Sequence, residues 1–138
     1  MPLFTSTYTN RVDKKGRVSV PASFRATLPE GDQTITVLRS LNGAAIEGFD
    51  AGYLQDISEK VDNFDLLTSA LPKQNPAMKI LRKSAPLNID SDGRVVLPQD
   101  YMAHAGITDR AVFVGLGRTF QIWSPEEHDR AMGEEEED

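Results

Sequence analysis

One nine-residue pattern occurs twice in this chain of 138 residues. Residues 13–21 (DKKGRVSVP) align without a gap on residues 90–98 (DSDGRVVLP), so both copies read Asp-x-x-Gly-Arg-Val-x-(Val or Leu)-Pro. The alignment extends to Phe24 with Tyr101, and each copy is followed by a loop and a β-rich stretch, at 34–38 and at 111–114. Internal repetition of this kind is typical of a repeated structural unit. We therefore expect a duplicated module.

The first and fourth residues of each copy predict a tight turn. An Asp side chain can accept hydrogen bonds from backbone amides two residues further on, and Gly tolerates a positive φ. These positions are Asp13 and Gly16 in the first copy and Asp90 and Gly93 in the second. Because apolar residues alternate on both sides of each turn, we predict two β-hairpins with these turns at their tips.

Prolines and capping residues predict the helices. Pro21 and Pro98 suit the first position of a helix, because an amide there has no partner in any case. Short helices are therefore expected to begin at these two prolines and to run through 24–28 and 101–105, the second ended by Gly106.

Three further helices are expected on the same grounds. They are a helix capped by Asp50 with the stripe Leu54, Ile57 and Val61, broken by Pro72 and Pro76; a short helix with Met78, Ile80 and Leu81 beside the basic Lys79, Arg82 and Lys83; and a helix opened by Ser124 and Pro125 that runs to Met132 and stops at Gly133.

Charge is distributed unevenly along the chain. The formal net charge is −6, but five acids form the terminal run 134–138, and without them the body carries only −1. Like charges in such a run repel one another and bury nothing, so we expect a disordered acidic tail at 134–138. The lysines and arginines are concentrated in the first forty residues and around the second repeat, so an anionic partner is compatible with the sequence.

Composition excludes several classes of protein and of site. There are no cysteines, so disulfides and thiolate metal sites cannot form, and a cytoplasmic location is expected. No apolar run is long enough to cross a membrane, so we expect no membrane partner. The body has enough apolar residues for a packed core of mainly β structure with short helices, an α+β fold.

No catalytic or cofactor motif is present, so we expect neither an enzyme, nor a cofactor, nor a small-molecule substrate. Residues 88–93 begin like a calcium-binding loop, but Gln99 stands where the bidentate Glu is required. His104 and His128 lack the spacing of metal ligands, so no metal site is predicted. Asp90 and Asp92 lie in a turn, which provides no cleft to separate their pKa values for acid–base catalysis.

The doubled pattern resembles the bacterial MraZ family. The resemblance runs from about residue 3 to 132 and includes residues 105–107 (AGI), 112–117 (VFVGLG) and 122–124 (IWS). It implies a swapped-hairpin fold of the AbrB and MazE kind, a double-split β-barrel in which the two repeats form an intrachain pseudo-dimer. The corresponding units here are a first AbrB-like repeat with its following helix at 3–70 and a second repeat at 71–133.

The resemblance also implies a function. MraZ proteins assemble into rings and regulate transcription, binding repeated elements of double-stranded DNA in the promoter of the division and cell-wall gene cluster. A nucleoid-associated homo-oligomer follows. The DNA-binding residues implied here are Lys14, Lys15, Arg17 and Arg94, held by the turn residues Asp13, Gly16, Asp90 and Gly93.

Two points remain open on the sequence alone. The second copy has Ser91 and Asp92 where the family carries basic or neutral residues, so the first hairpin is expected to contact DNA more strongly than the second. The alternative function is a protein-binding module of the same fold, in an antitoxin-like or scaffold role, which the acidic segments favour. The basic residues of 79–83 are interpreted as a solvated helix face rather than as a DNA contact.

Overall fold

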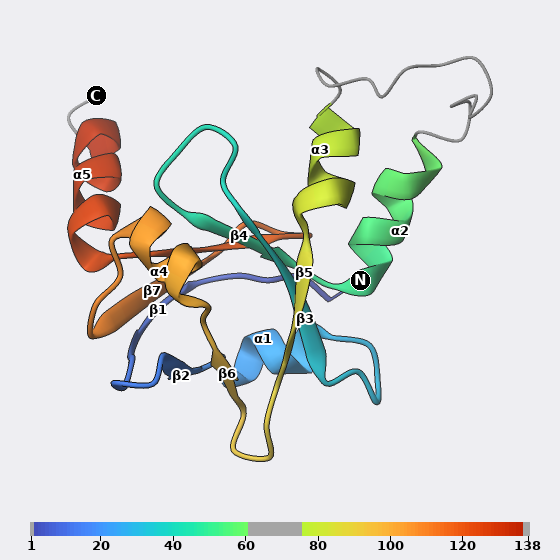
Figure 1. Cartoon of the computed structure of the whole chain (residues 1–138), viewed down its shortest axis with the longest axis horizontal. Helices are drawn as coiled ribbons and strands as arrows, with labels where there is room; N and C mark the ends of the chain where they lie inside the picture. The colour runs from blue at the N-terminus through green and yellow to red at the C-terminus, as the bar shows by residue number, and fades with distance from the viewer. Residues whose placement is uncertain (1, 61–75, 137–138) are drawn as a thin grey trace.

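The computed structural model of the chain describes residues 2–60 and 76–136. It is an α+β fold with antiparallel sheets (Figure 1). In chain order the elements are β1 (Thr7–Arg11), β2 (Arg17–Ser19), α1 (Ala22–Thr27), β3 (Thr34–Arg39), β4 (Ile46–Phe49), α2 (Ala51–Glu59), α3 (Pro76–Lys83), β5 (Ala85–Asn88), β6 (Arg94–Val96), α4 (Gln99–Ala105), β7 (Arg110–Gly115), β8 (Phe120–Trp123) and α5 (Pro125–Glu136).

The order of elements confirms the duplication. The series β1, β2, α1, β3, β4, α2 is followed, after α3, by β5, β6, α4, β7, β8, α5. The six-stranded sheet has the order β1-β7-β8-β4-β3-β5, which reads the same from either end when each strand is exchanged for its counterpart. The two repeats are therefore arranged about an approximate twofold relation. The axis of this relation passes between Glu47 and Gln121 of the sheet and between Val18 and Val95 of the β2–β6 ribbon. These are the central residue pairs of β4 with β8 and of β2 with β6.

Strand pairing differs from the local hairpins predicted by the alternation of apolar residues. Both tight turns form, but β1 pairs with β7, β3 pairs with β5, and β2 pairs with β6, so these partners all come from opposite repeats. The two sides of the first turn are joined by an isolated bridge between Val12 and Val18, together with the hydrogen bond from the Asp13 amide to the Arg17 carbonyl at 3.0 Å. Alternation identifies the buried face of a strand and carries no information about which strand will lie beside it.

The core lies between the sheet, the ribbon and α1, and both repeats contribute to it. Phe24 of α1 is 1% exposed and its ring centroid lies 5.3 Å from that of Phe4, 5.2 Å from that of Phe120 and 6.1 Å from that of Phe113. Burying a side chain of this size contributes about 1.5–3 kcal/mol. The aromatic cluster thus ties the N-terminal segment and α1 to strands of the second repeat.

Most of the predicted helices form, but two of them begin one residue later than predicted. Pro21 and Pro98 are N-caps rather than first helical residues, because their ψ angles of 139° and 147° still belong to extended chain. Asp50 caps α2 as predicted, its Oδ1 accepting the amide of Tyr53 at 2.9 Å, and Gly106 ends α4 in a left-handed conformation with φ of 68°. Residues 61–75, which include Val61, Pro72 and the predicted boundary between repeats at 70, lie outside the described residues.

The end of α5 was predicted wrongly. The Ser124 hydroxyl accepts the amide of Glu127 at 3.1 Å and opens the helix as expected, but Gly133 does not stop it. A glycine inside a helix costs only about 1 kcal/mol relative to alanine, and glutamates, which favour helix, follow it. The helix therefore continues to Glu136.

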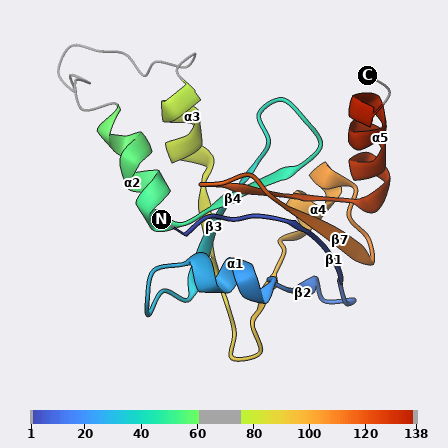
Figure 2. The same cartoon turned by 180° about the vertical axis from the view of Figure 1, so that it is seen from behind.

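The ribbon and the helices α2 and α3 lie toward opposite ends of the molecule. Figures 1 and 2 show β2, β6 and α1 below the six-stranded sheet, with α2, α3 and α5 above it. Within residues 2–60 and 76–136, no helix has both the length and the apolar content of a membrane span.

Candidate nucleic-acid interface

The first turn (residues 13–16) is held by the side chain of Asp13. Its Oδ1 accepts the amides of Lys15 and Arg17, both at 2.9 Å, and its backbone carbonyl accepts the amide of Gly16 at 3.0 Å. The remaining carboxylate oxygen, Oδ2, accepts Nε of Arg17 at 2.6 Å. One carboxylate therefore fixes both the shape of the turn and the orientation of the arginine that follows it.

Gly16 is required at this turn for two separate reasons. Its φ is +84°, a conformation that residues with a Cβ rarely adopt. A Cβ on Gly16 would also lie 2.9 Å from the carbonyl oxygen of Leu97, and the amide of Leu97 donates to the carbonyl of Gly16 at 2.9 Å. The turn is thus packed directly on the backbone of the second repeat.

The second turn (residues 90–93) repeats this backbone geometry. Asp90 Oδ1 accepts the amides of Asp92 at 2.8 Å and Arg94 at 3.0 Å, and its carbonyl accepts the amide of Gly93 at 3.0 Å. Gly93 has φ of +79°, and its carbonyl accepts the amide of Val20 at 2.9 Å. Each turn is therefore bonded through its glycine to the strand end of the other repeat.

The two arginines differ in how they are held. The terminal nitrogens of Arg17 make no hydrogen bond to any residue that the structure describes, so they remain available as donors. In Arg94 one terminal nitrogen donates to Asp92 Oδ2 at 3.2 Å, and the buried Nε is only in electrostatic contact with Asp90 Oδ2, at 3.4 Å, without a hydrogen bond. The carboxylate of Asp92 therefore engages one of the donor groups of Arg94.

The β2–β6 ribbon places both arginines on one face. Val18 and Val95 pair at its centre and are each 1% exposed, so the alternate residues Arg17, Ser19, Arg94 and Val96 lie on the opposite, outer face. Arg17 stands opposite Val96, and Arg94 stands opposite Ser19. The two arginines are diagonal neighbours, roughly 7–8 Å apart at their backbones, with one turn at each end of the ribbon.

The two turns also differ in their charged residues. The first carries the exposed Lys14 and Lys15 beside the Arg17–Asp13 pair, whereas the second has two acids around Arg94 and no lysine. The pKa of Asp13 is lowered, mainly because the Arg17 amide donates to it, with the Arg17 side chain and the Lys15 amide adding to the effect against partial desolvation. The pKa of Asp90 is lowered in the same way, chiefly by the amide of Arg94.

Three basic residues beside the turns were not among the predicted site residues. Arg11 at the end of β1 stands directly opposite Arg110 at the start of β7, and both are exposed. Like charges directly opposite one another are unfavourable unless an anion lies nearby. Arg25 of α1 lies against the second turn, where a Cβ on Gly93 would come within 2.8 Å of its guanidinium carbon, and its Nε donates to Val20 O at 3.1 Å.

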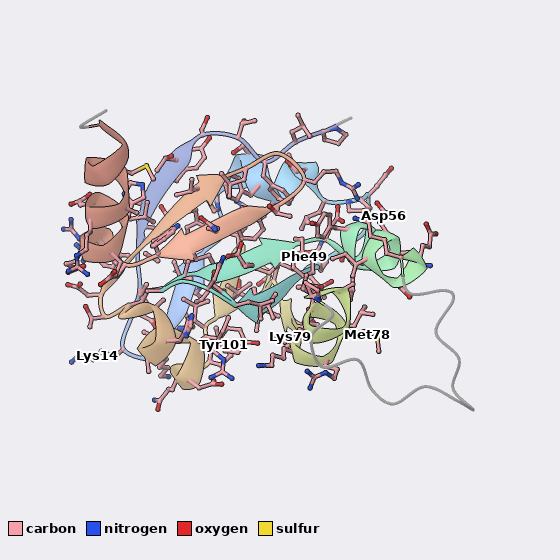
Figure 3. The ribbon with its side chains drawn as sticks, turned by 90° about the horizontal axis from the view of Figure 1, so that it is seen from above. Lys14, Phe49, Asp56, Met78, Lys79 and Tyr101 are labelled. Atoms are coloured by element: carbon pink, nitrogen blue, oxygen red, sulfur yellow. The ribbon has the colours of Figure 1, made fainter. Side chains whose placement is uncertain are left out.

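The predicted DNA contacts therefore gather at one end of the molecule. Lys14, Lys15 and Arg17 come together at the first turn with Arg11 and Arg110 beside them, and Arg94 shares the ribbon face. Figure 3 shows Lys14 at the edge of the molecule, away from Lys79. The basic residues of α3 lie on the other side of the sheet and do not join this group.

This arrangement is suited to binding an anionic surface. Exposed lysines and a planar guanidinium with free donors match phosphate oxygens and the acceptor edge of guanine. In the part of the chain that the structure describes, no group of three or more His, Asp or Glu side chains is placed to hold a metal ion.

The comparisons with known proteins agree with this description. The family model described as "MraZ protein, putative antitoxin-like" matches residues 3–69 and 80–138. A protein of Rhodospirillum rubrum named transcriptional regulator MraZ is 47% identical over 130 residues, covering 91% of this chain and 81% of its own length. Proteins of the same name from Gluconobacter oxydans (39% over 130 residues, 91% and 78%) and Rickettsia akari (36% over 135 residues, 96% and 88%) are also similar.

Proposed function

The chain belongs to the MraZ family, and we propose that it regulates transcription by binding direct repeats in promoter DNA through the two turns of its ribbon. The promoter of the division and cell-wall gene cluster, which the family resemblance implies, is the proposed target. A regulator of this kind works at the chromosome, so we expect it in the cytoplasm, at the nucleoid.

One observation supports this function above the others. At the first turn, three basic residues project from a backbone held by Asp13, and the terminal nitrogens of Arg17 have no hydrogen-bond partner among the described residues. A donor that is already oriented loses little conformational entropy when it binds. Arg17 is therefore the proposed reader of a base edge or phosphate, with Lys14 and Lys15 as phosphate contacts.

The second turn is proposed to contribute less. Arg94 shares the outer face of the ribbon, but Asp92 engages one of its terminal nitrogens and adds negative charge beside it. An approaching phosphate must compete with that carboxylate.

The fold is proposed to be a swapped-hairpin pseudo-dimer of the AbrB kind, closed as a double-split β-barrel. What supports this assignment is the exchange of strand partners between repeats and the strand order that reads alike from both ends.

A ring of subunits is proposed for energetic reasons. One chain presents only a few basic residues at its ribbon, and affinity for DNA grows with the number of phosphates neutralised. Linking identical modules can raise avidity by roughly 10²–10⁴ when their spacing matches the spacing of the sites. A closed ring provides such an array through one heterologous interface. Full affinity for a single repeat, or a monomer in sedimentation at working concentration, would exclude it.

The test compares single variants on DNA. Fluorescence anisotropy with the fragment upstream of the chain's own gene measures affinity for the intact protein, Arg17→Ala, Arg94→Ala and Asp92→Asn. We expect Arg17→Ala to lose about 1–3 kcal/mol on the specific fragment and less on random DNA. Arg94→Ala should lose less than Arg17→Ala, and Asp92→Asn should strengthen binding because it frees Arg94. Arg130→Ala, an exposed arginine of α5 remote from the ribbon, is the matched control.

Two results would contradict the proposal. A folded Arg17→Ala protein that binds as tightly as the intact chain would exclude the first turn as the reader. Affinity that does not fall as salt rises would exclude phosphate contacts altogether, since DNA binding releases counterions. The second result would favour a protein-binding role, the alternative to which the family description "antitoxin-like" points.

A further inference from the structure

An apolar hollow lies on the opposite side of the sheet from the ribbon. It has a volume of about 470 Å³, and its walls include Leu38 of β3, Phe49 of β4, Tyr53 of α2 and Ile80 of α3. The rings of Phe49 and Tyr53 pack with their centroids 5.2 Å apart. A hollow of this size and composition is typical of sites that bind small molecules.

A smaller, basic hollow adjoins the apolar one. It has a volume of about 220 Å³, and four of its lining residues are basic: Arg39, Lys79, Lys83 and His104. Leu41 and Lys79 line both hollows, so an apolar hollow and a basic hollow lie side by side. Figure 3 shows Lys79 and Tyr101 on the same side of the molecule, on α3 and α4.

The basic side chains come from three elements, β3, α3 and α4, and those of Arg39 and His104 are held by contacts within the described chain. The Arg39 guanidinium carbon lies 5.9 Å from the centroid of the Tyr101 ring, and the Tyr101 hydroxyl lies 3.5 Å from the carbonyl oxygen of Lys83. His104 Nε2 is 2.9 Å from the carbonyl oxygen of Gly43. Tyr101 therefore joins β3, the end of α3 and α4 at the border of the basic hollow.

Within residues 2–60 and 76–136, no carboxylate is paired with these cations. Among the described residues, none of Arg39, Lys79 and Lys83 forms an ion pair, and no acid lines the basic hollow. Glu47 lines the apolar hollow, but its carboxylate already accepts the Ser40 hydroxyl and the amide of Gln121. Cations gathered without a counter-charge repel one another, and an anion bound among them removes that repulsion.

We propose that the two hollows together bind one anionic amphiphile, a small soluble molecule with an apolar body and a single phosphate or carboxylate end. Its apolar body fills the space between Leu38, Phe49 and Ile80, and its anionic end lies between Lys79 and Lys83. The proposal goes beyond DNA binding and does not depend on it, because the site is remote from the ribbon.

The experiment uses the full chain and defined probes. The fluorescence of 1-anilinonaphthalene-8-sulfonate reports occupancy, and dodecyl phosphate, kept below its critical micelle concentration, is the competitor. We expect one dodecyl phosphate per chain to displace the dye. Dodecan-1-ol has only the apolar chain and inorganic phosphate has only the anionic group. Each should bind at least about tenfold more weakly than dodecyl phosphate. Equal competition by either half alone would overturn the proposal.

Variants locate the site. Lys79→Ala with Lys83→Ala removes the anion contacts, and Leu41→Asp places a negative charge where the two hollows meet. Each should weaken dodecyl phosphate binding by about tenfold or more, because the double variant loses hydrogen bonds to the charged end and Leu41→Asp repels it. Arg82→Ala, on the same helix but outside both hollows, is the matched control and should change affinity less than about twofold. Circular dichroism confirms that each variant is folded.

Other occupants give different results. Binding of dodecyl phosphate that all these variants leave unchanged would show that it lies elsewhere. Loss of self-association in sedimentation of the Lys79 and Lys83 double variant would identify the hollow as a contact between copies. A fall in DNA affinity comparable to that of Arg17→Ala would identify it as a DNA surface. Tighter binding to anionic phospholipid vesicles than to dodecyl phosphate would identify a membrane surface. Any of these results overturns the proposal.

Discussion

The glycine of the first turn provides the sharpest test of how the two repeats are joined. Gly16 has a left-handed backbone conformation and packs directly on the backbone of Leu97. Replacing it with alanine therefore introduces two costs at once. Gly31 has nearly the same φ, +83°, but a Cβ there would meet nothing within 4 Å, so Gly31→Ala introduces only the conformational cost.

The structure sets the expected magnitudes. A residue with a Cβ in a left-handed conformation loses roughly 1–2 kcal/mol, which is the whole expected loss for Gly31→Ala. In Gly16→Ala the new Cβ would stand 2.9 Å from the Leu97 carbonyl oxygen, a backbone atom that cannot rotate away. The shift that follows strains the hydrogen bond from Leu97 to Gly16, worth about 0.5–1.5 kcal/mol. The total expected for Gly16→Ala is roughly 1.5–3.5 kcal/mol.

The third glycine of this kind should fall between the other two. A Cβ on Gly93 would meet the guanidinium of Arg25, the end of a flexible side chain that can move aside. Urea unfolding followed by circular dichroism, at one protein concentration, measures the loss for the three variants. The free energy of unfolding should fall least in Gly31→Ala, more in Gly93→Ala and most in Gly16→Ala.

Equal losses for Gly16→Ala and Gly31→Ala would refute the reasoning. That result would mean that the contact between the first turn and Leu97 contributes nothing to stability beyond the conformation of the glycine. The two repeats would then be held together by the core and the sheet without help from the turns.

Three further predictions follow from single contacts. The pKa of Asp13 is held below the ordinary value of 3.8 by the Arg17 amide and its neighbours. The contribution of Asp13 to stability is therefore present above pH 3.8 and is lost as the pH falls through the lower pKa of the folded state. A carboxyl titration by NMR with a midpoint at or above 3.8 would contradict this. Asp50→Ala removes the cap of α2 and should cost about 1 kcal/mol in urea unfolding, whereas no loss would show that the cap is dispensable. Removing residues 134–138 should leave the melting temperature unchanged and slightly strengthen DNA binding at low salt, and a clearly lower melting temperature would contradict the view that this run only repels.

The local structure of the turns could be predicted from the sequence because short-range chemistry determines it. Asp at the first position and Gly at the fourth form the turns through contacts within five residues of chain. The strands over 34–38 and 111–114 and the caps at Asp50 and Ser124 were predicted for the same reason.

Long-range pairing could not be predicted in this way. β4 was not among the predicted strands, and its Gly48 leaves room for the ring of Phe120, which packs against the backbone there. The pairing of β2 with β6 rather than with β1 depends on which strands the packing of the whole core brings together. Arg11 and Arg110 become a candidate pair only through the register of β1 with β7, 99 positions apart in the chain (110 − 11).

The fold constrains the backbone of the two turns but leaves their charge free. Each turn must present its glycine carbonyl to an amide of the other repeat, Leu97 in one case and Val20 in the other, so both need Asp and Gly at the same positions. The two residues between Asp and Gly are exposed and make no such contact, so Lys14 and Lys15 can stand in one turn and Ser91 and Asp92 in the other without cost to the fold. The charge of these two positions is therefore expected to affect what each turn binds rather than how it folds. The approximate symmetry of the backbone therefore carries an asymmetric surface, and the first turn is the one that we propose to meet an anion.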